Sequence, residues 1–185
     1  MRSTNCSKMR ARALHGNAIG KGCGLSALLS LVLIVSGCAQ DGGNVLREGQ
    51  KAPPFTIDLI GGGTTSLDLH SGKSIAITFM SSWCPCSNES IPMMKQAHQA
   101  HQDEGLVLIM VGIQDSKEKF ANFVESRAIP FSAGYDKGNR IARNYGVRAP
   151  PTTVFVDKNR IVQRVFYGNI KDQEDNFYQW IEEIL

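Results

Sequence analysis

The most informative pattern in the chain is a pair of apolar segments separated by a stretch with helical spacing. The segments "SIAITFM" (74–80) and "LVLIMVGI" (106–113) are dominated by apolar residues, as expected of strands that are buried on both faces of a sheet. Between them, residues 87–103 have the pattern of a helix that contains Pro92. The central part of the chain is therefore predicted to form a strand, a helix and a second strand.

The rest of the chain continues this alternation. Periodicity and turn residues predict a short hairpin, a capped helix, a third strand, a short helix, a second hairpin and a final amphipathic helix. In chain order these elements fall at residues 52–69, 116–127, 131–136, 137–147, 152–168 and 171–185. We therefore expect an α/β fold, in which a mixed central β-sheet is flanked by helices.

The first part of the chain has a different character. The apolar run "LSALLSLVLIV" (25–35) follows five basic residues and no acidic one. It is too short to cross about 30 Å of hydrocarbon as a helix and has the pattern of a signal-peptide core. It ends in "VSGC", which resembles the bacterial lipobox. That resemblance implies a lipid on Cys38, and Ala39 after it favours the outer membrane.

On this interpretation the chain has a lipoprotein signal peptide at 1–37, a tether at 38–48 and one domain at 49–185. The whole chain carries a net charge of +3, but five of its 20 Lys and Arg and none of its 17 Asp and Glu precede Cys38, which leaves −2 for the remainder. Such a domain lacks the basic surface that binding to nucleic acid requires.

Two cysteines remain as thiols once Cys6 and Cys23 are removed with the signal peptide. They lie in "WCPC", residues 83–86, where Pro85 is suited to the first position of a helix. A thiol at a helix N-terminus faces unpaired N–H groups, which favour the thiolate. Outside the cytoplasm such a pair can persist as a disulfide. The sequence therefore predicts a redox site with Cys84 as nucleophile.

The spacing of the two cysteines is shorter by one residue than that of an ordinary redox pair. Helix positions two apart point about 200° from each other, whereas positions three apart differ by only about 60°. A disulfide between Cys84 and Cys86 is thus possible but strained, and strain makes it easy to reduce. Cys84 acting alone is the other possibility.

Three segments resemble the thioredoxin superfamily, in its membrane-tethered TlpA/ResA-like branch: residues 52–69, "SIAITFMSSWCPC" and "YGVRAPPTTVFVDKN". The resemblance implies a thioredoxin-like fold and a thiol–disulfide oxidoreductase without a further cofactor. It makes Cys84 an exposed nucleophile and Cys86 its assistant. It implies that Pro151 is a cis-proline facing them, and that Trp83, Pro85, Pro151 and Thr152 contact the substrate.

The same resemblance has consequences for Ser87 and for the expected partners. Pro92 matches the family's helix proline when the sequences are aligned without a gap, and this alignment puts Ser87 where the family has its second cysteine. The expected partners are secreted thiol or disulfide proteins and an upstream electron donor, at a lipid-anchored position facing the periplasm. Glu89 is either a proton relay or an ordinary first-turn acid.

Other functions use the same residues. "SSWCP" has some likeness to the peroxiredoxin signature through Ser81 and Cys84–Pro85, but position 77 is Ile and not the expected proline. A metal site could combine the two cysteines with a histidine from the set His70, His98 and His101. No histidine follows His101, which argues against a copper chaperone of this fold, and we expect no metal. A binding module without turnover is also possible.

Overall fold

Strand β3 (Ser74–Met80) lies in the middle of a five-stranded sheet, and all seven of its residues are buried. The computed structural model describes residues 45–185; the signal peptide, Cys38 and the tether up to residue 44 lie outside the described residues. The strand order is β5-β4-β3-β6-β7. β4 (Leu106–Gly112) and β5 (Ser132–Tyr135) run parallel to β3, while β6 (Thr152–Val156) is antiparallel to it and β7 (Val162–Tyr167) is antiparallel to β6. The mixed central sheet is confirmed.

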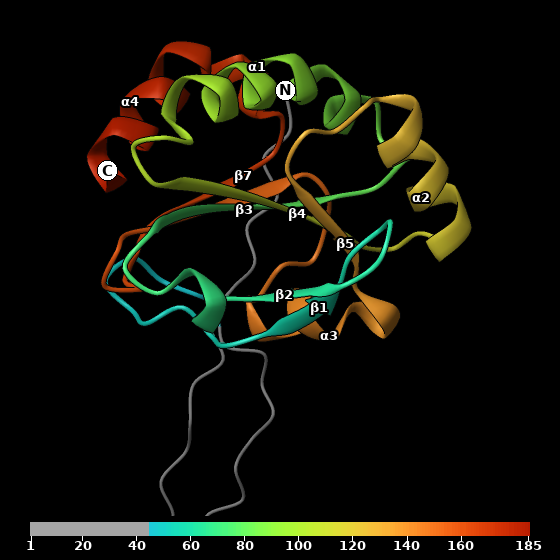
Figure 1. The fold of residues 1–185 in the computed structure, drawn as a ribbon, viewed down its shortest axis with the longest axis horizontal. Helices are drawn as coiled ribbons and strands as arrows, with labels where there is room; N and C mark the ends of the chain where they lie inside the picture. The colour runs from blue at the N-terminus through green and yellow to red at the C-terminus, as the bar shows by residue number, and fades with distance from the viewer. Residues whose placement is uncertain (1–44) are drawn as a thin grey trace, which may run out of the picture. The chain divides into compact units, whose positions relative to one another are not determined.

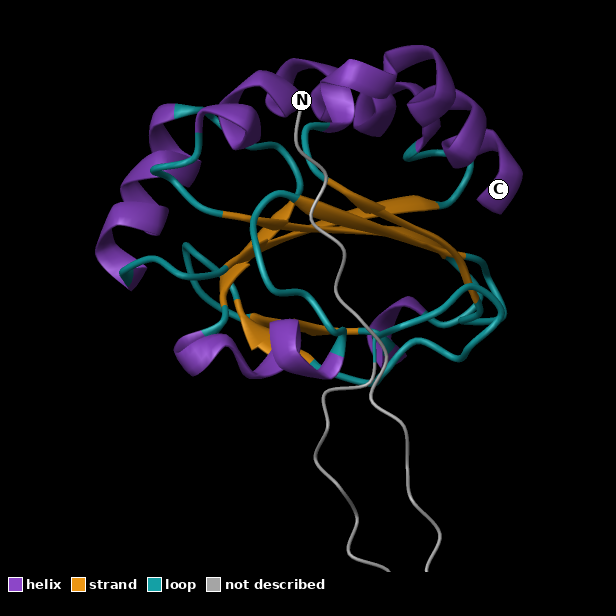
Figure 2. Cartoon of the chain, turned by 180° about the vertical axis from the view of Figure 1, so that it is seen from behind, coloured by secondary structure: helices purple, strands orange, loops and turns teal. Residues whose placement is uncertain are grey.

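Helices cover both faces of this sheet, as the two opposite views show (Figures 1 and 2). One face packs against α1 (Pro85–His101), α2 (Lys117–Ser126) and α4 (Glu174–Ile184), which contribute Met94, Phe120 and Phe177 to a shared apolar cluster. The other face packs against α3 (Arg140–Asn144) and a small hairpin, in a second cluster. Three short 3₁₀ helices complete the fold: η1 (Asp68–His70), η2 (Lys137–Asn139) and η3 (Ile170–Gln173).

The hairpin of β1 (Thr56–Asp58) and β2 (Thr64–Ser66) covers the edge of the sheet at β5. Its loop bonds to that strand, because the Ile60 amide donates to the Ala133 carbonyl at 2.8 Å. Gly134 allows the close approach, since a Cβ there would lie 2.7 Å from the Asp58 carbonyl oxygen. An otherwise free strand edge is thereby protected from pairing with other chains.

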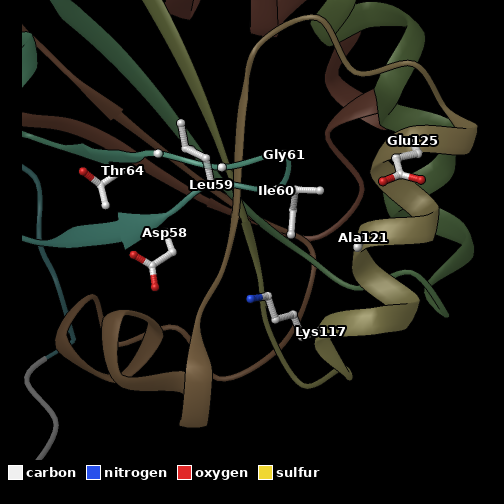
Figure 3. Close-up of a pocket in the computed structure, with 10 residues that line it drawn as sticks. Asp58, Leu59, Ile60, Gly61, Thr64, Lys117, Ala121 and Glu125 are labelled. Atoms are coloured by element: carbon white, nitrogen blue, oxygen red, sulfur yellow. The ribbon is translucent and has the colours of Figure 1, made fainter.

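A groove of about 570 Å³ runs between the hairpin loop and α2. Figure 3 shows the charged side chains of Asp58, Lys117 and Glu125 around it, together with Gly61. Neither Cys84 nor Cys86 lines this groove, so it is not part of the predicted redox site.

The elements that the hydrophobic pattern predicts are present in the described part of the chain. Ser116 caps α2 as expected, with its hydroxyl accepting from the Lys119 amide at 3.2 Å. Leu46, which the sequence places in the tether, is only 7% exposed and belongs to the second apolar cluster. No helix between residues 45 and 185 is long and apolar enough to cross a bilayer.

Candidate redox site

Cys84 caps the N-terminus of α1. Its backbone is extended (φ −87°, ψ 117°), and Pro85 begins the helix. The Ser87 amide donates to the Cys84 carbonyl at 3.1 Å, while the thiol makes no capping hydrogen bond. The thiol therefore lies at the N-terminus of α1.

The loop before β6 lies directly opposite this thiol. The peptide bond between Pro150 and Pro151 is cis, as the resemblance implied, and the Cys84 Sγ donates to the Pro150 carbonyl at 3.9 Å. Thr152 is only 1% exposed, and its hydroxyl donates to the Ala149 carbonyl at 2.9 Å. In this structure Thr152 therefore shapes the loop, whereas Pro150 faces the thiol.

The expectation that Cys84 is exposed is wrong. The residue is only 7% exposed, because the Pro150 loop covers it, whereas Cys86 is partly exposed. The two cysteines are not joined in the structure. Cys84 is therefore largely shielded from solvent.

Ser87 and Cys86 occupy different sides of the first helical turn. Ser87 is fully buried, and its hydroxyl accepts from the Ser81 amide at 3.4 Å. Cys86 lies one position earlier and faces partly outward. The side that points inward, where a partner for Cys84 is expected from helix geometry, is thus occupied by a hydroxyl.

Cys86 also has a distinct electrostatic environment. Desolvation raises the pKa of the Cys86 thiol above its ordinary value, and the nearby Cys84 and Glu89 raise it further. Glu89 is held by Asn169, whose amide donates to the Glu89 carboxylate at 2.7 Å. Ser90 completes this network, because its hydroxyl lies 2.9 Å from the Cys86 carbonyl and 3.2 Å from the Asn169 side-chain oxygen.

Gln114 connects the loops of the site, and sequence reasoning did not identify it. Its carbonyl accepts from the Trp83 indole at 2.9 Å, and its side-chain amide donates to the Arg148 carbonyl at 2.7 Å. Its own amide donates to the Asn139 side chain at 2.8 Å. Gln114 has a positive φ of 50°, which is unusual for a residue other than glycine and often marks a functional site. The signal in the sequence that could have identified Gln114 is its position just after a buried strand.

Asp115 supports the same loop. Its carboxylate accepts from the Ser82 amide at 2.6 Å, and its carbonyl accepts from the Tyr135 hydroxyl at 2.8 Å. Gln114 and Asp115 together tie the segment before Cys84 to the end of β4. These contacts fix the segment that leads into Cys84.

An apolar cavity of about 630 Å³ opens beside Pro150. Tyr167 and Val45 line it, and Arg148 is its one charged lining residue. Trp83 is 58% exposed and Tyr167 52% exposed. Pro150 connects this apolar cavity with the site, while neither cysteine nor Trp83 lines the cavity itself.

The residues that a peroxidase or a metal site would use make other contacts in the structure. The Ser81 hydroxyl donates to the Ile113 carbonyl and not to the Cys84 thiol. His70 pairs with Thr65, and His101 pairs with Glu104. Between residues 45 and 185 no group of three or more His, Cys, Asp or Glu side chains is arranged to hold a metal ion.

Comparison with known proteins identifies relatives of this chain. The model of the AhpC/TSA family matches residues 48–165, which is more than half of the chain. The thiol-disulfide oxidoreductase ResA of Bacillus thuringiensis is 27% identical over 138 residues, which cover 74% of this chain and 79% of ResA. The ResA of Geobacillus thermodenitrificans is 28% identical over 127 residues, covering 68% of this chain and 72% of that protein.

Solved structures share the fold. A provisionally assigned thiol:disulfide interchange protein DsbE from Chlorobium tepidum has a TM-score of 0.71 and 24% identity, and the match covers 75% of this chain and 98% of that one. These structures establish the thioredoxin fold for the described domain.

The first prediction concerns the cysteine spacing. Cys86→Pro combined with Ser87→Cys gives "WCPPC", in which the second thiol takes the buried position of Ser87. Helix geometry predicts a less strained disulfide and a more negative reduction potential than for the natural pair. Glutathione titration measures the difference, at about 30 mV for each 1.4 kcal/mol. Cys86→Pro alone is the control and forms no internal disulfide. A natural pair that is harder to reduce would show that Cys86 already faces Cys84.

The second prediction concerns Gln114. Gln114→Gly removes the bond to Arg148 but relieves the positive φ, so the stability to urea should not fall. We expect the exchange rate with a peptide disulfide to drop by about three- to ten-fold, the effect of one hydrogen bond. Alkylation of Cys84 by iodoacetamide should not slow, because a loosened Pro150 loop covers the thiol less.

Ala128→Gly is the matched control for Gln114→Gly. Ala128 also has a positive φ, at 45°, and lies exposed in the loop after α2. It should leave both rates unchanged. An exchange rate in Gln114→Gly equal to that of the unmodified protein would rule out a positioning role.

Proposed function

The chain belongs to the AhpC/TSA family, and on this premise we propose that it is a thiol–disulfide oxidoreductase that acts through Cys84, assisted by Cys86. The observation that carries the proposal is the position of the Cys84 thiol, at the N-terminus of α1 and 3.9 Å from the Pro150 carbonyl. The relatives named thiol-disulfide oxidoreductase support this class of reaction.

The first step is an attack on a partner's disulfide. The Cys84 thiolate forms a bond to one sulfur of that disulfide, and the other sulfur leaves as a thiolate that takes up a proton. The product is a mixed disulfide between Cys84 and the partner. The exposed Trp83 and the cavity beside Pro150 provide the surface on which the partner lies.

The second step releases the partner. Cys86 loses its proton and attacks the Cys84 sulfur, so that the partner leaves with its second thiol and the protein keeps a Cys84–Cys86 disulfide. The partner has then gained two electrons and two protons. An upstream dithiol returns the protein to its reduced form, and the same steps in reverse oxidise a dithiol partner.

The raised pKa of Cys86 gives these steps an order. While Cys84 is a thiolate, its charge helps to keep Cys86 protonated. Formation of the mixed disulfide removes that charge, so the pKa of Cys86 falls at the moment when it has to attack. Cys84 is thus the first nucleophile and Cys86 the second.

The proposed location follows from the N-terminal sequence. The basic and apolar pattern before "VSGC" supports export, with a lipid on Cys38 and residence in the cell envelope, on the outer membrane. A tether of the residues after Cys38 would then hold the domain near the membrane.

A peroxidase is the second candidate, since peroxide could attack the same thiol. The Ser81 hydroxyl is engaged by the Ile113 carbonyl and is not available to Cys84. This observation favours disulfide exchange over rapid peroxide reduction.

The third prediction tests the reaction. Cys84→Ser should abolish reduction of a peptide disulfide, while Cys86→Ser should form the mixed disulfide and release it slowly. Mass spectrometry of acid-quenched mixtures identifies the trapped species. Fast and saturable hydrogen peroxide consumption that depends on Cys84 would favour the peroxidase instead.

The fourth prediction concerns the pH dependence of the second step. In the mixed disulfide, desolvation and Glu89 still raise the pKa of Cys86, so release should accelerate at higher pH than for an ordinary thiol. Glu89→Gln removes one cause of the raised pKa, and the release profile should therefore move toward lower pH. Single-turnover release measured across pH tests this.

Glu118→Gln is the control for Glu89→Gln, because Glu118 is an acid near the start of a different helix, α2. It should leave the profile in place. A shift of the Glu89→Gln profile toward higher pH would mean that Glu89 acts mainly as a proton acceptor for Cys86.

A further inference from the structure

The chain enters the folded domain beside the reacting thiol. The Gly49 amide donates to the Val162 carbonyl at 2.8 Å, and Lys51 forms an antiparallel bridge with Ile161. Because the two segments run in opposite directions, residues before Gly49 lie toward the other end of β7. Val45 accordingly lines the cavity beside Pro150 together with Tyr167.

The end of β7 at Tyr167 is also the end of the sheet that carries Cys84. Tyr167 pairs with Thr152, and Thr152 pairs with Phe79, one residue before β3 ends. Leu46 is buried in the core and fixes the chain at this point. The point at which the chain enters the domain and the Cys84 thiol therefore lie at the same end of the sheet.

The distance from this entry to the expected lipid is short. Cys38 and Val45 are seven positions apart in the sequence, a span of at most about 25 Å when fully extended. A flexible linker of that length has a root-mean-square span of about 15 Å. The opposite end of the sheet is farther from Val45 by about 20 Å, the length of β7.

The face around the thiol has the composition of a surface that meets lipid. In the described domain, four large apolar side chains are exposed, and three of them surround this edge: Val45 (49%), Trp83 (58%) and Tyr167 (52%). Trp and Tyr are the side chains that favour the interface between bilayer and water. Arg148, the one charged residue of the cavity lining, is suited to anionic lipid headgroups.

We propose that the tether holds the Cys84 face of the domain against the lipid surface, so that the site exchanges disulfides at the membrane. The proposal rests on the lipid anchor of the proposed function. It adds an orientation: Val45 and Tyr167 face the headgroups, the β6–β7 turn points away, and Trp83 beside Cys84 remains for the partner. Partners that present their sulfur atoms at the bilayer surface are then reached most easily.

Energy transfer to labelled lipid tests this orientation. The lipid-modified protein, carrying Cys84→Ser and Cys86→Ser, receives one new cysteine at either Tyr167 or Asn159, the two ends of the β7 region. Each variant is labelled with a fluorophore and placed in vesicles of phosphatidylethanolamine and phosphatidylglycerol that contain rhodamine-labelled lipid. We expect more transfer from position 167 than from position 159.

A longer tether is the matched control. Insertion of about 20 Gly and Ser residues after Gly43 raises the root-mean-square span to about 29 Å, and the difference between the two labels should be lost. If Tyr167→Cys does not fold, Arg148→Cys replaces it, since that exposed residue lines the same cavity.

Equal transfer from both positions with the natural tether, or more from position 159, would overturn the orientation. If a Cys38→Ser protein binds the vesicles as well as the unmodified protein does, Cys38 does not carry the anchor. The proposed orientation then fails as well. Neither result bears on the chemistry, because exchange between the unmodified protein and a soluble peptide disulfide is measured separately.

Discussion

The site depends on the pairing of β3 along both of its edges. β3 is bonded in parallel to β4 and antiparallel to β6, and all its side chains are buried. Its end is therefore fixed relative to the end of β4 and the start of β6, and the Ile113 amide still donates to the Met80 carbonyl at 2.9 Å. The loops that leave these three positions carry Cys84, Gln114 and Pro151. One rigid set of strands thus brings together residues that lie far apart in the sequence.

The shortened cysteine spacing gives the two thiols different surroundings. Because α1 begins at Pro85, Ser87 points into the core and Cys86 remains partly exposed. Desolvation, Cys84 and Glu89 raise the pKa of the Cys86 thiol, while Cys84 lies under the Pro150 loop. A pair with such unequal environments favours a fixed order of attack over two interchangeable thiols, and this agrees with the order that the proposed mechanism assigns.

Much of the fold could be predicted because its signals are local. The apolar segments of β3 and β4, and the Ser116 cap, depend on residues close together in the chain. The burial of Cys84 could not be predicted, because the loop that covers it lies 66 residues later in the sequence. The role of Gln114 also depends on bonds to distant segments, since its partners Trp83 and Arg148 are 31 and 34 residues away. The sequence did show that Gln114 is a polar residue immediately after a buried strand.

The double proline at 150 and 151 limits how this loop can bind a partner. Pro150 has no N–H group, so the residue opposite Cys84 offers a carbonyl acceptor and no donor. In the reduced state that carbonyl accepts from the Cys84 thiol. When Cys84 forms a mixed disulfide, its S–H is lost and the carbonyl becomes free to accept an N–H from the partner's backbone. On the proposed mechanism, docking and reaction are therefore linked at one oxygen atom, and the exposed Trp83 next to Cys84 supplies further contact. This mechanism makes the side chains beside the partner's cysteine more important for recognition than pairing with its backbone.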